Sequence, residues 1–327
     1  MSTPTLLFTM SLEAEHRRAI EAGLPPDVDY LYLEGVEPDR RATVIADADA
    51  IVTFRPRDEL DDAAFEALHT DQIVQTTSAG VDHFPLDRLP DGIVLQSNAG
   101  AYAEPIAEHV LAMYLALTKR LRIEHRKLQE GTFDQFRPTL RVDGSTCGIF
   151  GFGEIGTASA SLLQSVGVTI RAINRSGAAE ESVEFLGTPD DLEDVLRQSD
   201  GVVISAPLTP ETRGVIDREK LRWLADDAIL INVARGELID QQALYDHLQA
   251  NPEFRAGIDT WWNEPARDEA FAPEYPFLDL PNVVGSPHNS AQVPGINERG
   301  LERAAANAVK ALTTGNPINV VDPDLGY

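Results

Sequence analysis

The sequence has 327 residues, enough for two domains that each bury a core, and its hydrophobic content of 43% is ordinary for a globular protein. Its 53 Asp and Glu residues against 27 Lys and Arg residues give a formal net charge of −26. This charge argues against a nucleic-acid partner, because no basic patch is evident. No apolar run approaches the ~20 residues that span a bilayer, so no membrane partner is expected.

The acidic residues are spread along the chain instead of forming a tail. Only Lys119, Lys127, Lys220 and Lys310 are lysines, so arginine supplies the other basic charges. Such a surface is either an ordinary solvated one or an adaptation to high salt, where screening relieves its self-repulsion. We favour the halophilic interpretation.

The first residues of the chain and its single cysteine indicate where in the cell the protein is expected. The first residues carry no basic group before a short apolar run, so we expect a strand and a helix there and not a signal peptide. Cys147 is the only cysteine, which excludes an intrachain disulfide, and its apolar surroundings in the sequence predict an inert core thiol. A cytoplasmic location is therefore expected.

Short apolar runs alternate with amphipathic ones over residues 1–97, which predicts a parallel α/β sheet covered on both faces. The expected strands are 6–10, 30–33, 50–53, 73–76 and 94–96, and the expected helices are 11–22, 38–48 and 62–69. Between the fourth and fifth strands, SAGVDHF at 78–84 includes Gly80, which suits a turn that presents successive backbone N–H groups to an anion. The alternative is an ordinary exit from a strand.

A long helix is predicted over residues 103–126, because Ile106, Val110, Met113 and Leu117 recur at helical spacing. Its apolar positions are broad enough to face two surfaces. Its many charges favour a core or subunit-packing role over a membrane segment.

Residues 146–176 have the pattern of a dinucleotide-binding βαβ unit. A strand at 147–150 leads into Gly151, Gly153 and Gly156, which form G-x-G-x-x-G, and a helix at 155–166 precedes a second strand at 168–173. The glycines allow a tight turn, close approach of a pyrophosphate and close packing of helix on strand. The helix N-terminus offers N–H groups to the phosphates. The alternative is a tight turn without a ligand.

Further apolar runs at 201–205, 228–233, 256–260 and 283–285 complete a doubly wound sheet, with helices at 189–197, 217–224, 240–250 and 296–313 and a tail at 315–327. Three ionisable residues follow different strands of this sheet: Arg235, Glu264 and His288. Arginine could hold a carboxylate, histidine could transfer a proton, and glutamate could orient the imidazole. Taken singly, each could instead be an ion-pair donor, a turn residue or an ordinary loop histidine.

Several stretches together resemble the D-isomer-specific 2-hydroxyacid dehydrogenases. They run in the family's order from 78 to 291: SAGVD, AEHVLAMYLAL, GIFGFGEIG, SAPLTPETRGVID, LINVARGELID, the region of DTWWNEP, and SPHNSA. The resemblance implies that Arg235 binds the substrate carboxylate, that His288 is the acid/base and that Glu264 pairs with it. It also implies that the N–H groups of Ala79 and Gly80 help to bind the carboxylate.

The resemblance implies an α/β fold of two Rossmann-like, doubly wound parallel-sheet domains with a cleft between them. The dinucleotide-binding domain would be 98–290, and a discontinuous substrate domain would combine 1–97 with 291–327. A homodimer is expected, joined largely through the coenzyme domain and its long helix. No metal is implied.

The coenzyme preference is predicted from the residues at the end of the second strand of the βαβ unit. An NAD enzyme usually has an acidic residue there, whereas this chain has Asn174, Arg175 and Ser176. We predict NADP(H) as the preferred coenzyme, with NAD(H) as the second candidate. The expected coenzyme-binding residues are Gly151, Gly153, Glu154, Ile155, Gly156, Asn174, Arg175, Ser176, Ala206, Pro207, Thr212, Val233, Ala234, Asp259 and His288.

The reaction implied is reversible reduction of a 2-oxo acid to the D-2-hydroxy acid. Trp261 and Trp262 replace less bulky family residues and either line or buttress the pocket, so glyoxylate, hydroxypyruvate, pyruvate and longer 2-oxo acids all remain candidates. A phosphoglycerate dehydrogenase is less favoured, because no regulatory domain is evident. A dinucleotide-sensing corepressor of the same fold is a rival function, and so is a formate-type dehydrogenase, against which Glu264 argues.

Overall fold

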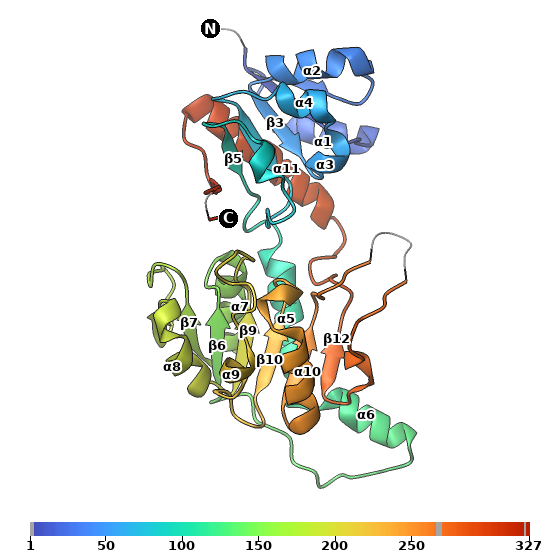
Figure 1. The fold of residues 1–327 in the computed structure, drawn as a ribbon, viewed down its shortest axis with the longest axis vertical. Helices are drawn as coiled ribbons and strands as arrows, with labels where there is room; N and C mark the ends of the chain where they lie inside the picture. Colours follow the sequence, from blue (N-terminus) through green and yellow to red (C-terminus); the bar gives the residue numbers. More distant parts are fainter. Residues whose placement is uncertain (1–2, 266–269, 324) are drawn as a thin grey trace. The chain divides into compact units, whose positions relative to one another are not determined.

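The computed structural model describes residues 3–265, 270–323 and 325–327. The chain divides into two compact units, one made of residues 1–102 and 293–327 and the other of residues 103–292 (Figure 1). Each unit is built on one parallel sheet, so the predicted fold class is confirmed. The substrate and coenzyme roles assigned to 1–97 with 291–327 and to 98–290 stay predictions.

The first unit has a five-stranded sheet in the order β2-β1-β3-β4-β5, all parallel. Its strands are β1 Thr5–Phe8, β2 Asp29–Tyr32, β3 Ala50–Thr53, β4 Ile73–Thr76 and β5 Val94–Gln96. Every residue of β3 and β4 is buried. The continuous apolar character of these runs in the sequence therefore reflects a sheet covered on both faces.

The helices of this unit cover both faces of the sheet. They are α1 Ala14–Gly23, α2 Pro38–Asp47, α3 Pro56–Glu59, α4 Asp62–Glu66, the 3₁₀ turn η1 Leu86–Arg88 and α11 Ile296–Thr314. The C-terminal helix α11 packs on β3 and β4 through fully buried alanines such as Ala304 and Ala308. The tail then returns to the sheet edge, where Val320 forms an antiparallel bridge with Gln96.

The second unit has a seven-stranded parallel sheet in the order β12-β11-β10-β9-β6-β7-β8. The strands are β6 Thr146–Phe150, β7 Thr169–Ile173, β8 Phe185–Gly187, β9 Gly201–Ile204, β10 Ile229–Asn232, β11 Arg255–Ile258 and β12 Val283–Gly285. The order reverses between β6 and β9, which pair directly. Doubly wound sheets bind ligands at the carboxyl ends of the strands that flank such a reversal.

The helical elements of the second unit are α5 Ala103–Thr118, α6 Leu121–Gln129, α7 Glu154–Ser165, η2 Pro189–Asp191, α8 Leu192–Arg197, α9 Arg218–Leu221, η3 Gly236–Leu238, α10 Gln241–Ala250 and η4 Phe277–Asp279. Helix α5 packs against α7, β10 and β11. Cys147 is a free, fully buried thiol in β6, and this burial raises its pKa.

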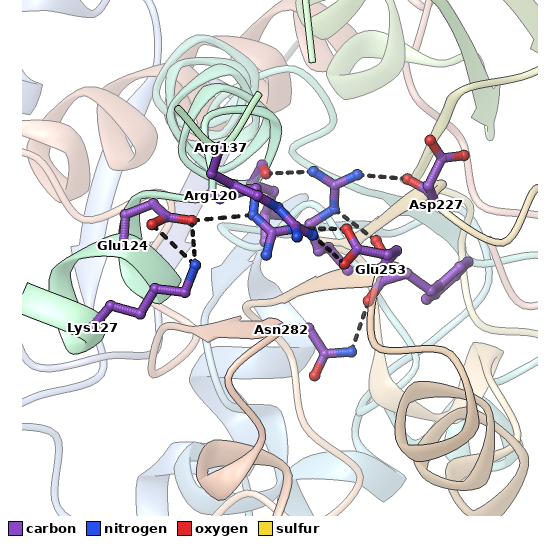
Figure 2. A network of polar contacts seen from close by, with 10 residues as sticks. Arg120, Glu124, Lys127, Arg137, Asp227, Glu253 and Asn282 are labelled. Atoms are coloured by element: carbon purple, nitrogen blue, oxygen red, sulfur yellow. Dashed lines mark hydrogen bonds and ion pairs between the residues drawn. The ribbon is translucent and has the colours of Figure 1, made fainter. Parts of the chain in front are cut away.

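The prediction of one helix over 103–126 is wrong, because the helix breaks between α5 and α6. Arg120 has a left-handed backbone with φ of 54°, which is uncommon for a residue other than glycine. Its side chain is only 8% exposed and forms a 2.6 Å ion pair with Glu253, which also binds Arg137 at 2.7 Å (Figure 2). These contacts hold the chain in the conformation that ends α5.

Other differences are local. The short elements α3 and β8 are not among the predicted ones, and the helix predicted at 217–224 is only the four residues of α9. Strand β8 has only three residues and lies at the sheet edge, so its apolar run is too short to predict a strand. Among the described residues, no helix combines the length and apolar character needed to cross a membrane.

Candidate active site and coenzyme site

The imidazole of His288 and the carboxylate of Glu264 are hydrogen-bonded, with 2.8 Å between Nδ1 and Oε2. An ionised carboxylate can only accept, so Nδ1 carries the hydrogen and Nε2 is the nitrogen available for exchanging a proton with a ligand. The side chains are 39% and 38% exposed, respectively, which leaves both within reach of a small molecule.

The carboxylate of Glu264 is held in its ionised form. Burial raises its pKa, but hydrogen bonds from His288 and from the backbone N–H of Trp261, together with the charges of His288 and Arg235, leave that pKa below the ordinary value. Arg235 therefore lies close enough to act on Glu264 electrostatically. The second unit thus brings the three ionisable residues expected from the sequence into one electrostatic environment.

The loop after β12 that carries His288 is held by hydrogen bonds from its backbone N–H groups to Asp259. His288 has a left-handed φ of 49°, and its N–H donates to the carbonyl oxygen of Asp259 at 2.8 Å. Asp259 has no exposed surface, and its carboxylate accepts hydrogen bonds from the backbone N–H groups of Asn289 and Ser290 at 3.2 and 3.3 Å. A buried side chain after β11 thereby orders the loop after β12.

Two further residues belong to this arrangement, and neither is among the site residues that the sequence predicts. The hydroxyl of Ser286 donates to Oδ1 of Asp259, and Nε2 of His109, from α5, lies 2.9 Å from the same hydroxyl oxygen. Because the hydroxyl hydrogen points to the carboxylate, the oxygen of Ser286 accepts from His109. His109 lies in the stretch AEHVLAMYLAL, but only the fold brings it to Ser286.

Arg235 follows β10 in a tightly held loop. Asn232 donates from its side chain to the carbonyl oxygen of Arg235 at 2.8 Å and accepts from the N–H of Ala234 at 3.0 Å. A Cβ on Gly236 would lie 2.5 Å from the backbone of Trp261, so only glycine fits beside Arg235. The half-buried guanidinium donates to the carbonyl oxygen of Ala234 at 2.7 Å.

The glycine-rich turn lies between β6 and α7 and suits a dinucleotide. A Cβ on Gly151 would overlap the backbone of Ala206, and one on Gly156 would overlap the carbonyl of Gly151, so both glycines are needed for packing. A Cβ on Gly153 would meet nothing within 4 Å. Gly153 therefore leaves open space at the N-terminus of α7, where unpaired backbone N–H groups attract a phosphate.

The end of β7 is adjacent to this turn, since the N–H groups of Gly151 and Phe152 both donate to the carbonyl oxygen of Ile173. Asn174 binds the backbone of Ala178 and Gly177 at 2.8 and 2.7 Å and so shapes the following turn. Arg175 and Ser176 are exposed. Arg175 and Ser176, two of the three residues expected to bind the coenzyme ribose, thus follow a strand end that is hydrogen-bonded to the glycine turn.

The remaining expected coenzyme residues lie in the first turn of α7 and in loops that follow strands of the same sheet. Glu154 is exposed and Ile155 half-buried in the first turn of α7, and Ala206, Val233 and Ala234 are buried. The loop after β9 closes on itself, because the hydroxyl of Thr212 donates to the carbonyl oxygen of Pro207 at 2.7 Å. Within the described residues, no group of three or more His, Cys, Asp or Glu side chains is arranged to hold a metal ion.

The loop of Ala79 and Gly80 belongs to the first unit and follows β4. Ser78 shapes it, accepting a hydrogen bond at its carbonyl oxygen from the N–H of Asn98 and donating from its hydroxyl to the carbonyl oxygen of Gly80 at 2.9 Å. Gly80 has no positive φ. Within the described residues the N–H groups of Ala79 and Gly80 donate to no acceptor, as a loop that binds an anion requires.

Comparison with known proteins identifies a family for this chain. Residues 111–290 match the family model described as D-isomer specific 2-hydroxyacid dehydrogenase, NAD binding domain. The chain is similar to the glyoxylate reductase of Korarchaeum cryptofilum (strain OPF8), with 30% identity over 307 residues that cover 90% of each protein. It is also 29% identical to the D-3-phosphoglycerate dehydrogenase of Mycobacterium bovis over 95% of this chain but only 57% of that protein's length.

Among solved structures, the D-isomer specific 2-hydroxyacid dehydrogenase of Xanthobacter autotrophicus Py2, in complex with NADPH and MES, superposes with a TM-score of 0.81. It is 26% identical, over 99% of this chain and 100% of that one. The chain therefore belongs to the D-isomer specific 2-hydroxyacid dehydrogenase family, as its motifs predict. It is an NAD(P)-dependent oxidoreductase that acts on 2-hydroxy acids.

Proposed function

We propose that the protein catalyses the reversible reduction of a small 2-oxo acid to the D-2-hydroxy acid with NADP(H), and that His288 is the acid/base. The observation that carries this proposal is the 2.8 Å hydrogen bond between Nδ1 of His288 and Glu264. It orients the ring so that Nε2 can protonate the substrate carbonyl oxygen. The ionised Glu264 stabilises the protonated imidazole that this step requires.

Substrate binding requires donors for a carboxylate. Arg235 supplies a guanidinium that can bind both carboxylate oxygens at once. The N–H groups of Ala79 and Gly80 supply further donors from the segments 1–97 and 291–327, to which we assign substrate binding. Each of these groups can bind a carboxylate oxygen or polarise an adjacent carbonyl.

The coenzyme would lie on the glycine turn of the segment 98–290, with its pyrophosphate over the open space at Gly153 and the N-terminus of α7. Its nicotinamide ring supplies the hydride. Arg175 and Ser176 can bind a 2′-phosphate, and no carboxylate occupies positions 174–176 to repel it. The related Xanthobacter structure contains NADPH, which agrees with an NADP(H) preference.

Glyoxylate and hydroxypyruvate are the substrates we would test first. The glyoxylate reductase of Korarchaeum cryptofilum matches this chain along 90% of both lengths, whereas the phosphoglycerate dehydrogenase matches over 57% of its own. Pyruvate and longer 2-oxo acids complete the panel. Loss of nicotinamide absorbance with NADPH and with NADH measures both substrate and coenzyme preference, and no turnover with any 2-oxo acid would contradict the proposal.

The role of His288 has its own test. We expect His288→Ala to lower kcat by at least about 100-fold, because general acid catalysis is lost, while NADPH binding measured by fluorescence titration is retained. Unchanged turnover would remove His288 from the mechanism.

We also propose a cytoplasmic homodimer adapted to high salt. Large apolar side chains are exposed on α6 and the segment after it, namely Leu121, Leu128, Phe133 and Phe136. A second copy of the chain would cover them, so sedimentation should give twice the monomer mass. Thermal stability should rise with salt, and a protein most stable in dilute buffer would contradict the halophilic interpretation.

A further inference from the structure

Trp261 contacts both sides of the pair formed by His288 and Glu264. Its backbone N–H donates to Oε1 of Glu264 at 3.0 Å. Its indole Nε1–H donates to the carbonyl oxygen of Ser286 at 2.8 Å, two positions before His288. One residue is therefore bonded to the carboxylate that orients the imidazole and to the loop that carries it.

The indole of Trp261 is fixed by its surroundings. It is 7% exposed, and its ring centroid lies 5.0 Å from that of Phe271 and 6.4 Å from that of Phe277. A Cβ on Gly285, the last residue of β12, would lie 2.9 Å from Cζ2 of this indole. The ring thus rests on the strand end that leads into Ser286 and His288.

We propose that Trp261 is a positioning residue that sets the place of the His288 imidazole through Glu264 and Ser286. This inference rests on the proposed role of His288 as the acid/base. The left-handed backbone of His288 is unfavourable for a residue with a Cβ, so its loop needs anchors. The hydrogen bond to the carbonyl oxygen of Ser286 requires an indole, because a phenyl or aliphatic side chain of similar volume has no donor.

Trp262 provides a matched control. Its indole Nε1–H donates to the carbonyl oxygen of Ile239 at 2.7 Å, and its ring stacks on Phe277 at 5.2 Å between centroids. It therefore has the same chemistry and a similar aromatic environment, but it bonds to the segment that leads into α10. Loss of its hydrogen bond should affect stability without displacing His288.

The experiment compares Trp261→Phe with Trp262→Phe, using NADPH and the 2-oxo acid that the wild-type protein reduces fastest. We expect Trp261→Phe to lower kcat about 3- to 10-fold, the loss that one net hydrogen bond supports, with little change in KM or in NADPH affinity. Trp262→Phe should retain the wild-type kcat, even if it lowers Tm as much as Trp261→Phe does. Equal kcat in the two variants, or a change confined to KM, would overturn the inference.

A double-mutant cycle with Gly285→Ala gives a second measurement. The added methyl group would lie 2.9 Å from Cζ2 of the indole and 2.8 Å from Cδ2 of Leu278. Gly285→Ala should therefore lower kcat in the wild-type background, and the part of that loss caused by the indole should disappear in the Trp261→Phe background, where the ring is smaller. Additive losses would overturn the inference.

His288→Ala distinguishes failure of the proposed function from failure of the inference about Trp261. If His288→Ala keeps its turnover, the proposed function fails as well. If His288→Ala is inactive while Trp261→Phe is unaffected, only the role of Trp261 is rejected.

Discussion

The hydroxyl of Ser286 donates a 2.5 Å hydrogen bond to Oδ1 of Asp259, a carboxylate with no exposed surface. The same hydroxyl oxygen lies 2.9 Å from Nε2 of His109. Ser286 thus joins α5, the loop after β11 and the loop of His288 at one point. A buried carboxylate is costly unless its oxygens accept hydrogen bonds, so this serine should matter for stability.

Ser286→Ala should therefore destabilise the protein by about 1 to 3 kcal/mol, because a buried acceptor and the facing imidazole both lose their partner. Thermal and urea unfolding measure the effect. Ser165→Ala is the control, since Ser165 is exposed on the last turn of α7 and donates only to the carbonyl oxygen of Leu162. Similar stabilities for the two variants would contradict the argument.

Glu264→Gln tests the orienting carboxylate. The amide can still accept from Nδ1 of His288, but the negative charge that favours the protonated imidazole is gone. We expect kcat for reduction to fall roughly 10- to 100-fold, with a smaller change in KM. Glu274→Gln makes the same substitution at an exposed position and should leave kcat unchanged. A Glu264→Gln variant with normal kcat would show that hydrogen bonding alone is sufficient.

Arg175→Ala tests the coenzyme preference. Loss of a charge-assisted bond to a 2′-phosphate should lower kcat/KM with NADPH about 10- to 100-fold and should change kcat/KM with NADH much less. Arg197→Ala removes an exposed arginine on α8 that pairs with Glu193, and it should affect neither coenzyme. Equal losses with both coenzymes would assign Arg175 a structural role, and a wild-type preference for NADH would end the NADP(H) proposal.

The sequence predicts most strands of both sheets because a buried parallel strand is a continuous apolar run, and β3, β4, β9, β10 and β11 are buried at every residue. It predicts the glycine turn because G-x-G-x-x-G is a short motif, and within it a Cβ on Gly156 would overlap the carbonyl of Gly151. By contrast, the break after α5 depends on Arg120 and Glu253, which are 133 positions apart in the sequence. A pattern read within one helix contains no information about such a partner.

In the candidate site, too, motifs are predictable from the sequence and contacts between distant residues are not. The expectation that Glu264 pairs with His288 rests on the family's motifs, and the structure contains that hydrogen bond, while their roles in catalysis stay predictions. The link from His109 to Asp259 could not be predicted, because a histidine on an apolar helix carries no sign of what it faces. The sequence does not decide whether Trp261 and Trp262 line the pocket or support it from behind. Their indole N–H groups bond to the backbone of Ser286 and Ile239, which is what a buttress does.

Glu253 offers a prediction about pH. Burial raises its pKa, but the charges and hydrogen bonds of Arg120 and Arg137 outweigh burial and leave the pKa below its ordinary value of 4.5. A carboxyl whose pKa is lower in the folded state adds stability above its ordinary pKa. That stability is lost as the pH falls through the lower, folded-state value.

Glu253→Gln should therefore lower Tm near neutral pH, and the difference from wild type should shrink as the pH falls below 4.5. High salt should also reduce the difference, because the Glu253 side chain is 49% exposed and its ion pairs are partly screened. Glu130→Gln breaks the more exposed pair with Arg126 and should change Tm less. A Tm difference for Glu253→Gln that persists in acid would mean that Glu253 stabilises the end of α5 by packing and not by its charge.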